Sequence, residues 1–201
     1  MNNRKVYISG EIVPEVDAKI SIFDSAVLLG DTVTESTRTF NFKPFKLDEH
    51  LERLYKSFKL TRIDPQMTIE EMKKVSLELL EINKDNYKAN EDCWLVHNIS
   101  RGHSITGGNP ALQVSKPTVM IYTQPMNLVS WAPFYSKGCH AVTPPTRMVP
   151  AQSLDARIKN RSRLFYTLAE IEAKLVDPDA QSVILDIHGN VAENKGGNIF
   201  M

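Results

Sequence analysis

A chain of 201 residues with 42% apolar residues can bury the core of one large domain or of two small ones. Its 24 basic and 24 acidic residues cancel, which argues against the strong positive field of proteins that bind nucleic acids or anionic membranes. Two cysteines give no disulfide framework, the N-terminal MNNRKVY lacks the apolar centre of a signal peptide, and no apolar run could span a bilayer. We therefore expect a cytoplasmic protein that binds neither nucleic acid nor membrane.

The first half of the chain alternates β-rich runs with two amphipathic helices. Asp48 is the expected N-cap of the first helix, and Thr68 with Glu71 forms a capping box for the second. Four stretches have the β-branched and apolar composition of strands bounded by turn residues. They are a hairpin around Gly10, residues 33–40, residues 94–100 and residues 118–122, with a Gly-Gly-Asn-Pro loop at 107–110 before the last.

A segment with the composition of a linker divides the chain. It runs over residues 123–136 and contains Pro125 and Pro133, which disfavour regular structure. We therefore expect one domain over residues 1–122, the linker over residues 123–136, and a second domain over residues 137–201 that is mostly β with one helix. The predicted fold class is α+β.

The segment from Leu154 to Met201 carries the pattern that bears most on chemistry. Cations stand at every second position, so in an extended segment all four would project from one side. They are Arg157, Lys159, Arg161 and Arg163. A helix is expected from about Ser162, with an apolar stripe that faces a core. The stripe consists of Leu164, Leu168, Ile171 and Leu175.

Beyond this helix, a strand over residues 183–187 turns at 188–190 and returns over 191–193. Glu193 is therefore expected at a strand end, beside a loop that contains Gly196 and Gly197, where the backbone can approach a ligand closely.

Lys159 is the candidate nucleophile of this segment. A lysine amine is almost entirely protonated at neutral pH, so it reacts only if nearby cations or loss of water lower its pKa. Arg157 and Arg161 would supply such cations. Taken alone, the same basic run is more typical of a solvated surface. Its combination with Glu193 and the glycine loop favours a site.

Four motifs in order resemble those of the class IV aminotransferases, the fold-type IV pyridoxal-phosphate enzymes. The motifs are LLGDTVTESTRTF, FKLDEHLERLYKSF, LDARIKNRSRL and AENKGGNIF. This group includes branched-chain and D-amino-acid aminotransferases and aminodeoxychorismate lyase. The resemblance runs from about Tyr7 to Met201 and implies an N-terminal α/β sandwich, a C-terminal pseudo-barrel, pyridoxal 5'-phosphate between them, and a homodimer.

The resemblance also implies roles for individual residues. Lys159 would form a Schiff base with the cofactor and move a proton at the substrate's α-carbon. Glu193 would face the pyridine nitrogen and keep the ring protonated. Arg53, in HLERL, would bind the cofactor phosphate, although an arginine beside Glu49 and Glu52 would otherwise be a surface ion pair. Gly196 would contact the cofactor, and no metal is expected.

The substrate is less defined. Arg38 is a possible carboxylate contact, Arg147 a possible neighbour of the cofactor's phenolic oxygen, and Arg101 a third substrate candidate; plain ion pairing is the competing role of each. Leu29 and Leu164 stand where branched-chain enzymes carry tyrosines. The loop after Arg101 lacks the carboxylate-binding residues of the D-amino-acid enzymes, so neither subclass is favoured.

Three functions follow from these observations. The first is transfer of an amino group from a small amino acid, branched-chain-like, or an amine to a 2-oxo acid. The second is an aminodeoxychorismate-type lyase of the same fold. The third is a truncated, non-enzymatic homologue whose RIKNRSR run is a solvated or nucleic-acid-binding face. Relatives continue beyond the sequence NIF, so the second domain is expected to be incomplete within these residues.

Overall fold

The computed structural model describes residues 3–88, 91–103 and 116–200. The chain divides into two compact units. The first contains Met1–Met126 and a short later segment, Ile158–Ser162; the second contains Asn127–Arg157 and Arg163–Met201. The expected glycine loop at 107–110 lies outside the described residues.

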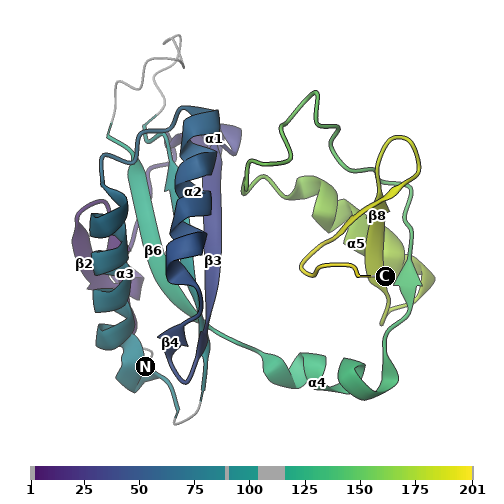
Figure 1. Ribbon diagram of the computed structural model, residues 1–201, viewed down its shortest axis with the longest axis horizontal. Helices are drawn as coiled ribbons and strands as arrows, with labels where there is room; N and C mark the ends of the chain where they lie inside the picture. Colours follow the sequence, from purple (N-terminus) through teal and green to yellow (C-terminus); the bar gives the residue numbers. More distant parts are fainter. Residues whose placement is uncertain (1–2, 89–90, 104–115, 201) are drawn as a thin grey trace. The chain divides into compact units, whose positions relative to one another are not determined.

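An antiparallel sheet forms the centre of the first unit (Figure 1). Among the described residues it has six strands in the order β2-β1-β6-β5-β3-β4. The strands are β1 (Lys5–Ile8), β2 (Glu11–Pro14), β3 (Thr32–Phe40), β4 (Lys43–Pro44), β5 (Cys93–Ser100) and β6 (Thr118–Pro125). The strands expected from composition, including the hairpin at Gly10, are confirmed.

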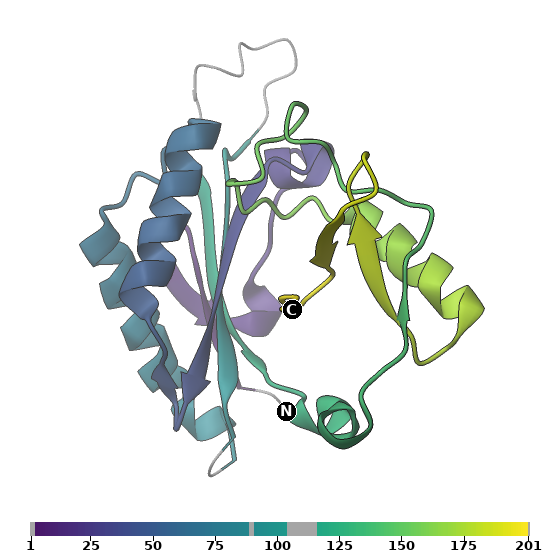
Figure 2. The same ribbon diagram turned by 45° about the vertical axis from the view of Figure 1, so that its right-hand side comes forward.

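Two long helices cover one face of this sheet. Figure 2 shows α2 (Leu47–Thr61) and α3 (Ile69–Asn83) side by side on that face, while α1 (Ser25–Leu29) precedes β3. Short 3-10 helices lie at Glu15–Asp17 and Lys84–Asn86. Each long helix turns an apolar stripe toward the sheet. Burial of this stripe stabilises the helix and determines which side of it packs on the sheet. The buried core includes Leu51, Leu54, Phe58, Met72, Leu79, Leu95, Ile99 and Ile121.

The helix starts test two expectations. The capping box of Thr68 and Glu71 is present at the start of α3. The expected N-cap Asp48 is wrong, because α2 begins at Leu47 after Lys46, which adopts a left-handed conformation with φ of 54°. Asp48 lies instead in the first turn, where a negative charge interacts favourably with the helix dipole.

The second unit is built around a smaller sheet. Within the described part of the chain, its three strands run in the order β7-β8-β9, with β7 parallel and β9 antiparallel to β8. Its elements are α4 (Leu128–Lys137), β7 (Ala141–Val142), α5 (Leu164–Val176), β8 (Gln181–Leu185) and β9 (Val191–Asn194). With the first unit, this gives the α+β class that the sequence predicts.

The buried face of α5 differs from the predicted stripe. Leu164, Leu168, Ile171 and Leu175 are exposed, whereas Tyr166, Ala169 and Ala173 are buried. Tyr166 and Ala169 pack against Ile184 of β8. The small alanines let the helix approach the sheet closely, and a three-stranded sheet covers only one side of it. The expectation that the leucine stripe faces the core is therefore wrong for the described residues.

The domain boundaries also differ in detail from the expectation. Residues 123–136 are not an irregular linker, because they contain the end of β6 and most of α4, which Asn127 caps by accepting from the Ser130 N–H. The units divide inside this segment, between Met126 and Asn127. The segment Ile158–Ser162, expected in the second domain, belongs to the first unit.

Neither a membrane-spanning helix nor a metal-binding cluster of side chains occurs among the described residues. No helix there is long and apolar enough to cross a bilayer. No group of three or more His, Cys, Asp or Glu side chains in the described ranges is placed to bind a metal ion. Cys93 is buried and Cys139 is exposed, and both are thiols.

Candidate active site

Lys159 lies in a short extended segment that hydrogen-bonds to β3. The N–H of Thr34 donates to the Lys159 carbonyl at 2.9 Å, and the N–H of Arg161 donates to the Thr32 carbonyl at 2.8 Å. Asn160 is thereby paired with Val33 as an isolated antiparallel bridge. Backbone pairing with β3 is the physical reason that this segment belongs to the first unit.

A glycine permits this close approach. Gly30 ends α1 in the left-handed region, with φ of 66°, and a Cβ built there would lie 3.0 Å from Ser162 Oγ. A side chain at position 30 would therefore be strained in its backbone and would also crowd the lysine segment. The motif LLGD is thus connected in space to the motif that contains Lys159.

Helix α2 holds the other side of Lys159. The N–H of Lys159 donates to Ser57 Oγ at 3.2 Å, and Ser57 Oγ donates to the Arg53 carbonyl at 3.2 Å. Ser57 is fully buried. Arg53 and Ser57 lie one helical turn apart, so a single helix carries both the contact to Lys159 and the predicted phosphate ligand.

Arg53 is fixed by a carboxylate that the sequence analysis did not single out. Its Nε donates to Glu35 Oε2 at 2.7 Å and its Nη2 to Glu35 Oε1 at 2.6 Å, which is bidentate geometry. The Glu35 side chain is 0% exposed, whereas that of Arg53 is 52% exposed. Nη1 makes no hydrogen bond to any described residue, so one edge of the guanidinium faces outward while the other is held.

The environment keeps Glu35 ionised. Burial alone would raise the pKa of Glu35, but hydrogen bonds from His50, Arg53 and the Ser36 N–H outweigh it and lower the pKa to about 2. His50 Nδ1 lies 3.0 Å from Glu35 Oε1. The carboxylate is therefore a negative charge at any physiological pH, paired with the half-exposed Arg53.

The arrangement of the basic run differs from the expectation. Residues 156–158 form a turn rather than a strand, so the four cations do not share one extended face. Arg157 binds Asp155 through Nε at 3.0 Å and Nη2 at 2.6 Å, so its charge is compensated. Arg157 is thus not the uncompensated neighbour of Lys159 that the alternating pattern predicts. Lys159 itself is half-buried.

Glu193 lies in the second unit, on β9 and opposite Ile184 of β8. Its Oε2 accepts a hydrogen bond from the hydroxyl of Tyr166 on α5. Tyr166 is 5% exposed, and burial followed by the contact with Glu193 raises the pKa of Tyr166 well above its ordinary value. The phenol is therefore a permanent donor to the carboxylate.

The glycine loop after Glu193 is closed by side chains. Asn194 Oδ1 accepts from the N–H groups of Gly196 at 3.1 Å and Gly197 at 3.0 Å. Lys195 forms an ion pair with Glu170 at 3.1 Å. The Gly196 N–H is thus already used within the loop, although the exposed glycine leaves room for a close approach from outside.

Arg147 and Glu193 flank the same end of β8 without meeting. Arg147 pairs with Leu185 as a parallel bridge, whereas Glu193 pairs with Ile184. The pairing of β8 with β9 shifts register between Ile184 and Leu185, so the regular alternation of strand faces is interrupted here. Arg147 Nη1 donates to the carbonyls of Pro144 at 2.6 Å and Pro145 at 3.0 Å.

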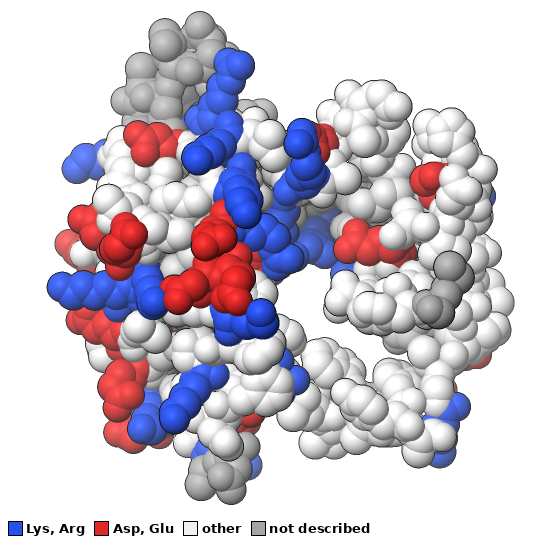
Figure 3. Space-filling model, in the orientation of Figure 1, with Lys and Arg blue, Asp and Glu red and all other residues white. Residues whose placement is uncertain are grey.

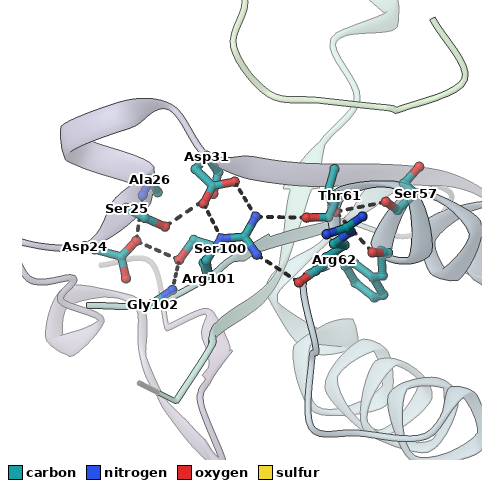
Figure 4. Close-up of polar contacts among 11 residues, drawn as sticks. Asp24, Ser25, Ala26, Asp31, Ser57, Thr61, Arg62, Ser100, Arg101 and Gly102 are labelled. Atoms are coloured by element: carbon teal, nitrogen blue, oxygen red, sulfur yellow. Dashed lines mark hydrogen bonds and ion pairs between the residues drawn. The ribbon is translucent and has the colours of Figure 1, made fainter. Parts of the chain in front are cut away.

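Arg101 has a structural position. Figure 4 shows its guanidinium between Asp31 and the end of α2. Nε donates to Asp31 Oδ2 at 2.9 Å, Nη1 to the Arg62 carbonyl at 2.8 Å, and Nη2 to the Thr61 carbonyl at 2.9 Å. The arginine caps the carbonyls at the helix C-terminus, which favours a structural role over a substrate contact.

Arg38 keeps its charge available. Its guanidinium stacks on the ring of Phe40 at 3.8 Å, and Nε donates to the Thr39 carbonyl at 3.3 Å. Arg38 makes no ion pair with any residue in the described ranges. On β3 it alternates with Glu35, so it points away from α2, toward the face of the first sheet that α2 and α3 leave uncovered.

The roles of Lys159, Arg53 and Glu193 stay predictions from the sequence, which did not single out Glu35, Ser57 and Tyr166, the residues that contact them. A signal existed for Glu35, because it shares the buried parity of β3 with Val33 and Thr37, where a charge needs a partner. Ser57 and Tyr166 had no comparable signal. In the structure Lys159 and Arg53 are brought together in the first unit, and Glu193 and Tyr166 in the second.

The chain was compared with known proteins. It matches the family described as amino-transferase class IV over residues 32–201. It is 36% identical over 198 residues to a protein of Methanocaldococcus jannaschii named "Putative branched-chain-amino-acid aminotransferase", covering 98% of this chain and 65% of that protein. It is 31% identical over 195 residues to aminodeoxychorismate lyase of Bacillus subtilis, covering 97% of this chain and 63% of that enzyme.

Solved structures give the same picture. The branched-chain amino acid aminotransferase of T.th., solved with pyridoxamine 5'-phosphate, superposes with a TM-score of 0.81 at 25% identity, covering 96% of this chain and 62% of that one. The chain therefore spans a little under two thirds of the length of these relatives.

Proposed function

Because the chain belongs to the class IV aminotransferase family, we propose that this protein is a pyridoxal-phosphate-dependent aminotransferase. The observation that carries the proposal is the position of Lys159, whose main chain is held between β3 and helix α2 and is connected through Ser57 to the turn that carries the half-exposed Arg53. A lysine and an arginine supported by the same helix suit a ligand that has an aldehyde at one place and a phosphate at another.

The donor set fits this cofactor. Lys159 would hold it through its amine, and the outer edge of Arg53 would bind the phosphate, since Nη1 is not used by the described residues. The carboxylate of Glu193 would bind the pyridine nitrogen and favour its protonated form. Gly196 would allow the backbone to approach the cofactor closely but would not donate its N–H, because that N–H already donates to Asn194 Oδ1.

The chemistry divides between cofactor and protein. When bound, pyridoxal phosphate supplies an electron sink that stabilises negative charge at the substrate's α-carbon. Lys159 is then the group that takes a proton from that carbon and returns it during the transfer. Glu35 keeps Arg53 oriented, so the phosphate contact requires little ordering when the cofactor arrives.

The proposed substrates are a small amino acid or amine as donor and a 2-oxo acid as acceptor. Arg38 is the proposed contact for the substrate carboxylate, because its guanidinium lies on the uncovered face of the first sheet without an ion pair to the described residues. Arg101 and Arg147 are weaker candidates, since their guanidinium groups already donate to main-chain carbonyls. A donor panel of L-branched-chain amino acids, D-alanine and R-phenylethylamine, with pyruvate or 2-oxoglutarate, identifies the pair.

A lyase of the aminodeoxychorismate type is the second candidate, and the likeness to the Bacillus subtilis enzyme supports it. The two functions differ in their need for an acceptor. Release of pyruvate from aminodeoxychorismate without any 2-oxo acid present would identify the lyase. Amino transfer that requires the 2-oxo acid would identify the aminotransferase.

We also propose that the protein works as a cytoplasmic homodimer, without nucleic acid or membrane as partner. Exposed apolar side chains around α1 support the dimer, because monomeric proteins rarely expose such an apolar patch to solvent. They are Ile22, Phe23, Val27, Leu28 and Leu29. Figure 3 shows both acidic and basic side chains on the helix-covered side of the first unit, and this mixture supports a protein without a nucleic-acid partner.

Substitution of Lys159 tests the proposal directly. The full-length wild-type protein is expected to be yellow with cofactor. After borohydride reduction, the cofactor should remain covalently attached to a peptide that contains Lys159. Lys159→Ala is expected to lose both the reducible attachment and turnover. Mass spectrometry of the digested, reduced protein measures the attachment.

The matched control is Lys195→Ala, which removes a lysine whose amine is paired with Glu170 in the second unit. It should keep the reduced label on the Lys159 peptide. Reducible attachment that persists in Lys159→Ala, or that never forms in the wild type, would contradict the proposal.

A further inference from the structure

The surroundings of Glu193 contain a polar side chain that the proposed chemistry does not yet use. Tyr166, on the first turn of α5, is 5% exposed, and its ring packs against Phe165 with centroids 4.2 Å apart. The Arg163 guanidinium lies over the same ring at 4.9 Å. The ring is therefore held from two sides, and its hydroxyl has little freedom to turn away.

That hydroxyl is directed at the carboxylate. It donates to Glu193 Oε2, and the cross-strand partner of Glu193, Ile184, packs in the same small core as Tyr166. Residues directly opposite on neighbouring strands share a face of the sheet, so Glu193 turns toward α5. No other hydrogen bond to the Glu193 side chain occurs among the described residues, which leaves Oε1 for a ligand.

We propose that Tyr166 is a positioning residue that holds Glu193 toward the pyridine nitrogen of the cofactor. The proposal rests on the proposed function and adds a residue to it. A carboxylate on a short strand of a three-stranded sheet rotates freely about its last bonds unless one oxygen is fixed. The Tyr166 bond fixes Oε2, so that the other oxygen meets the ring nitrogen without further ordering.

The Tyr166 hydroxyl also stays protonated, because burial raises its pKa, so it remains a donor to Glu193. A buried phenol whose own pKa is raised does not compete for the negative charge but donates a hydrogen bond to it. Donation to an ionised oxygen is about twice as strong as donation to a neutral one. Removing the Tyr166 hydroxyl should therefore weaken the interaction between Glu193 and a protonated ring nitrogen, although Tyr166 itself would not contact the cofactor.

The test is a double-mutant cycle on cofactor affinity in the full-length protein. The dissociation constant of pyridoxal phosphate is measured by visible absorbance for wild type, Tyr166→Phe, Glu193→Ala and the double variant. Tyr166→Phe is expected to raise the constant about 10-fold to 100-fold, the usual range for a bond to a charged group. In the Glu193→Ala background the same change should have almost no effect.

Tyr55→Phe is the matched control. The Tyr55 hydroxyl donates to the Met67 carbonyl at 2.8 Å in the first unit, and its ring is also partly buried, so this variant likewise removes one tyrosine hydrogen bond, here to a neutral acceptor. Both Phe variants should lower the melting temperature. Only Tyr166→Phe should change cofactor affinity.

The outcomes separate the two proposals. If wild type binds cofactor and Glu193→Ala weakens it, but Tyr166→Phe has no effect or an equal effect in both backgrounds, the positioning role is wrong and the proposed function stands. If wild type does not bind cofactor, the proposed function fails and the positioning role with it. Should Tyr166→Phe not fold, wild type labelled with 3-fluorotyrosine replaces it. One fluorine resonance must then move in Glu193→Ala, and no movement contradicts the hydrogen bond.

Discussion

Glu35 shows how a single buried charge organises the first unit. Its carboxylate accepts hydrogen bonds from Arg53, His50 and the Ser36 N–H, and its side chain is 0% exposed. A buried carboxylate is costly unless it is paired and hydrogen-bonded, and here both oxygens accept from a donor. Arg53 thereby loses its freedom to rotate and presents one edge outward. The ion pair with Glu35 compensates the positive charge of Arg53 and fixes the orientation of its guanidinium.

Glu35→Gln should reduce the free energy of unfolding by about 2 kcal/mol, because bidentate contact to Arg53 is lost inside the protein. The folded-state pKa of about 2 lies below the ordinary value of 4.5. Wild-type stability from this group is therefore full above pH 4.5 and is lost as pH falls toward 2. The variant should lack that part of the acid sensitivity. Denaturant unfolding at pH 7, 4 and 2.5 measures both effects.

The control for Glu35 is Glu15→Gln. Glu15 also makes a bidentate pair, with Arg4, at 2.9 Å and 3.0 Å, but its side chain is 43% exposed. Surface pairs contribute little, so this change should cost less than about 1 kcal/mol. If the free energy of unfolding fell equally in the two variants, burial of Glu35 would not be the reason that its ion pair with Arg53 is strong.

At the level of elements, α2 is the part of the first unit that connects Lys159, the proposed reactive lysine, with Arg53, the proposed phosphate ligand. Ser57 accepts from the Lys159 N–H and donates to the Arg53 carbonyl, so the spacing of the two groups follows the pitch of one helix. The opposite side of the lysine segment is paired with β3. Two rigid elements therefore hold a segment that has no regular structure of its own.

Ser57→Ala should speed hydrogen exchange at the Lys159 amide and weaken cofactor binding about fivefold, because one hydrogen bond of about 1 kcal/mol is lost. Ser76→Ala is the matched control. Ser76 is equally buried, donates to the Met72 carbonyl at 2.7 Å and contacts His97 at 2.8 Å, but does not touch the lysine segment. Similar losses of stability in both, with a cofactor effect in Ser57→Ala alone, are expected. An equal cofactor effect in Ser76→Ala would mean that general stability is responsible.

At the level of the whole molecule, the proposed site residues are distributed over both units. Lys159, Arg53 and Glu35 belong to the first, and Glu193 with Tyr166 to the second. The chain crosses between units more than once, because Ile158–Ser162 returns to the first. Separate expression of either unit is therefore expected to disrupt the pairing between β3 and the lysine segment, Ile158–Ser162.

Association of two copies can be tested at the apolar patch around α1. Ile22→Asp places a charge on a side chain that is 70% exposed in the single chain. If the patch is the dimer interface, the dimer dissociation constant should rise by about tenfold or more. Leu77→Asp, on the outer side of α3 and 41% exposed, is the control and should leave association unchanged. Sedimentation equilibrium distinguishes the two, and equal behaviour would place the interface elsewhere.

The sequence by itself determined the family, the α+β class, the strands of the first sheet, the capping box of α3 and the candidates Lys159, Arg53 and Glu193. These depend on local patterns, namely period-two and helical spacing, turn residues and motifs read along the chain. Such patterns state what a segment prefers on its own.

Only the tertiary structure decided which faces are buried and which charges are compensated. The leucine stripe of α5 is exposed because the small alanines on the other side pack on β8, a choice that local spacing does not encode. Likewise Lys159 is fixed by Ser57 from over 100 residues away. Partners distant in sequence meet only when the chain folds, so their selection is a property of packing and not of any one segment.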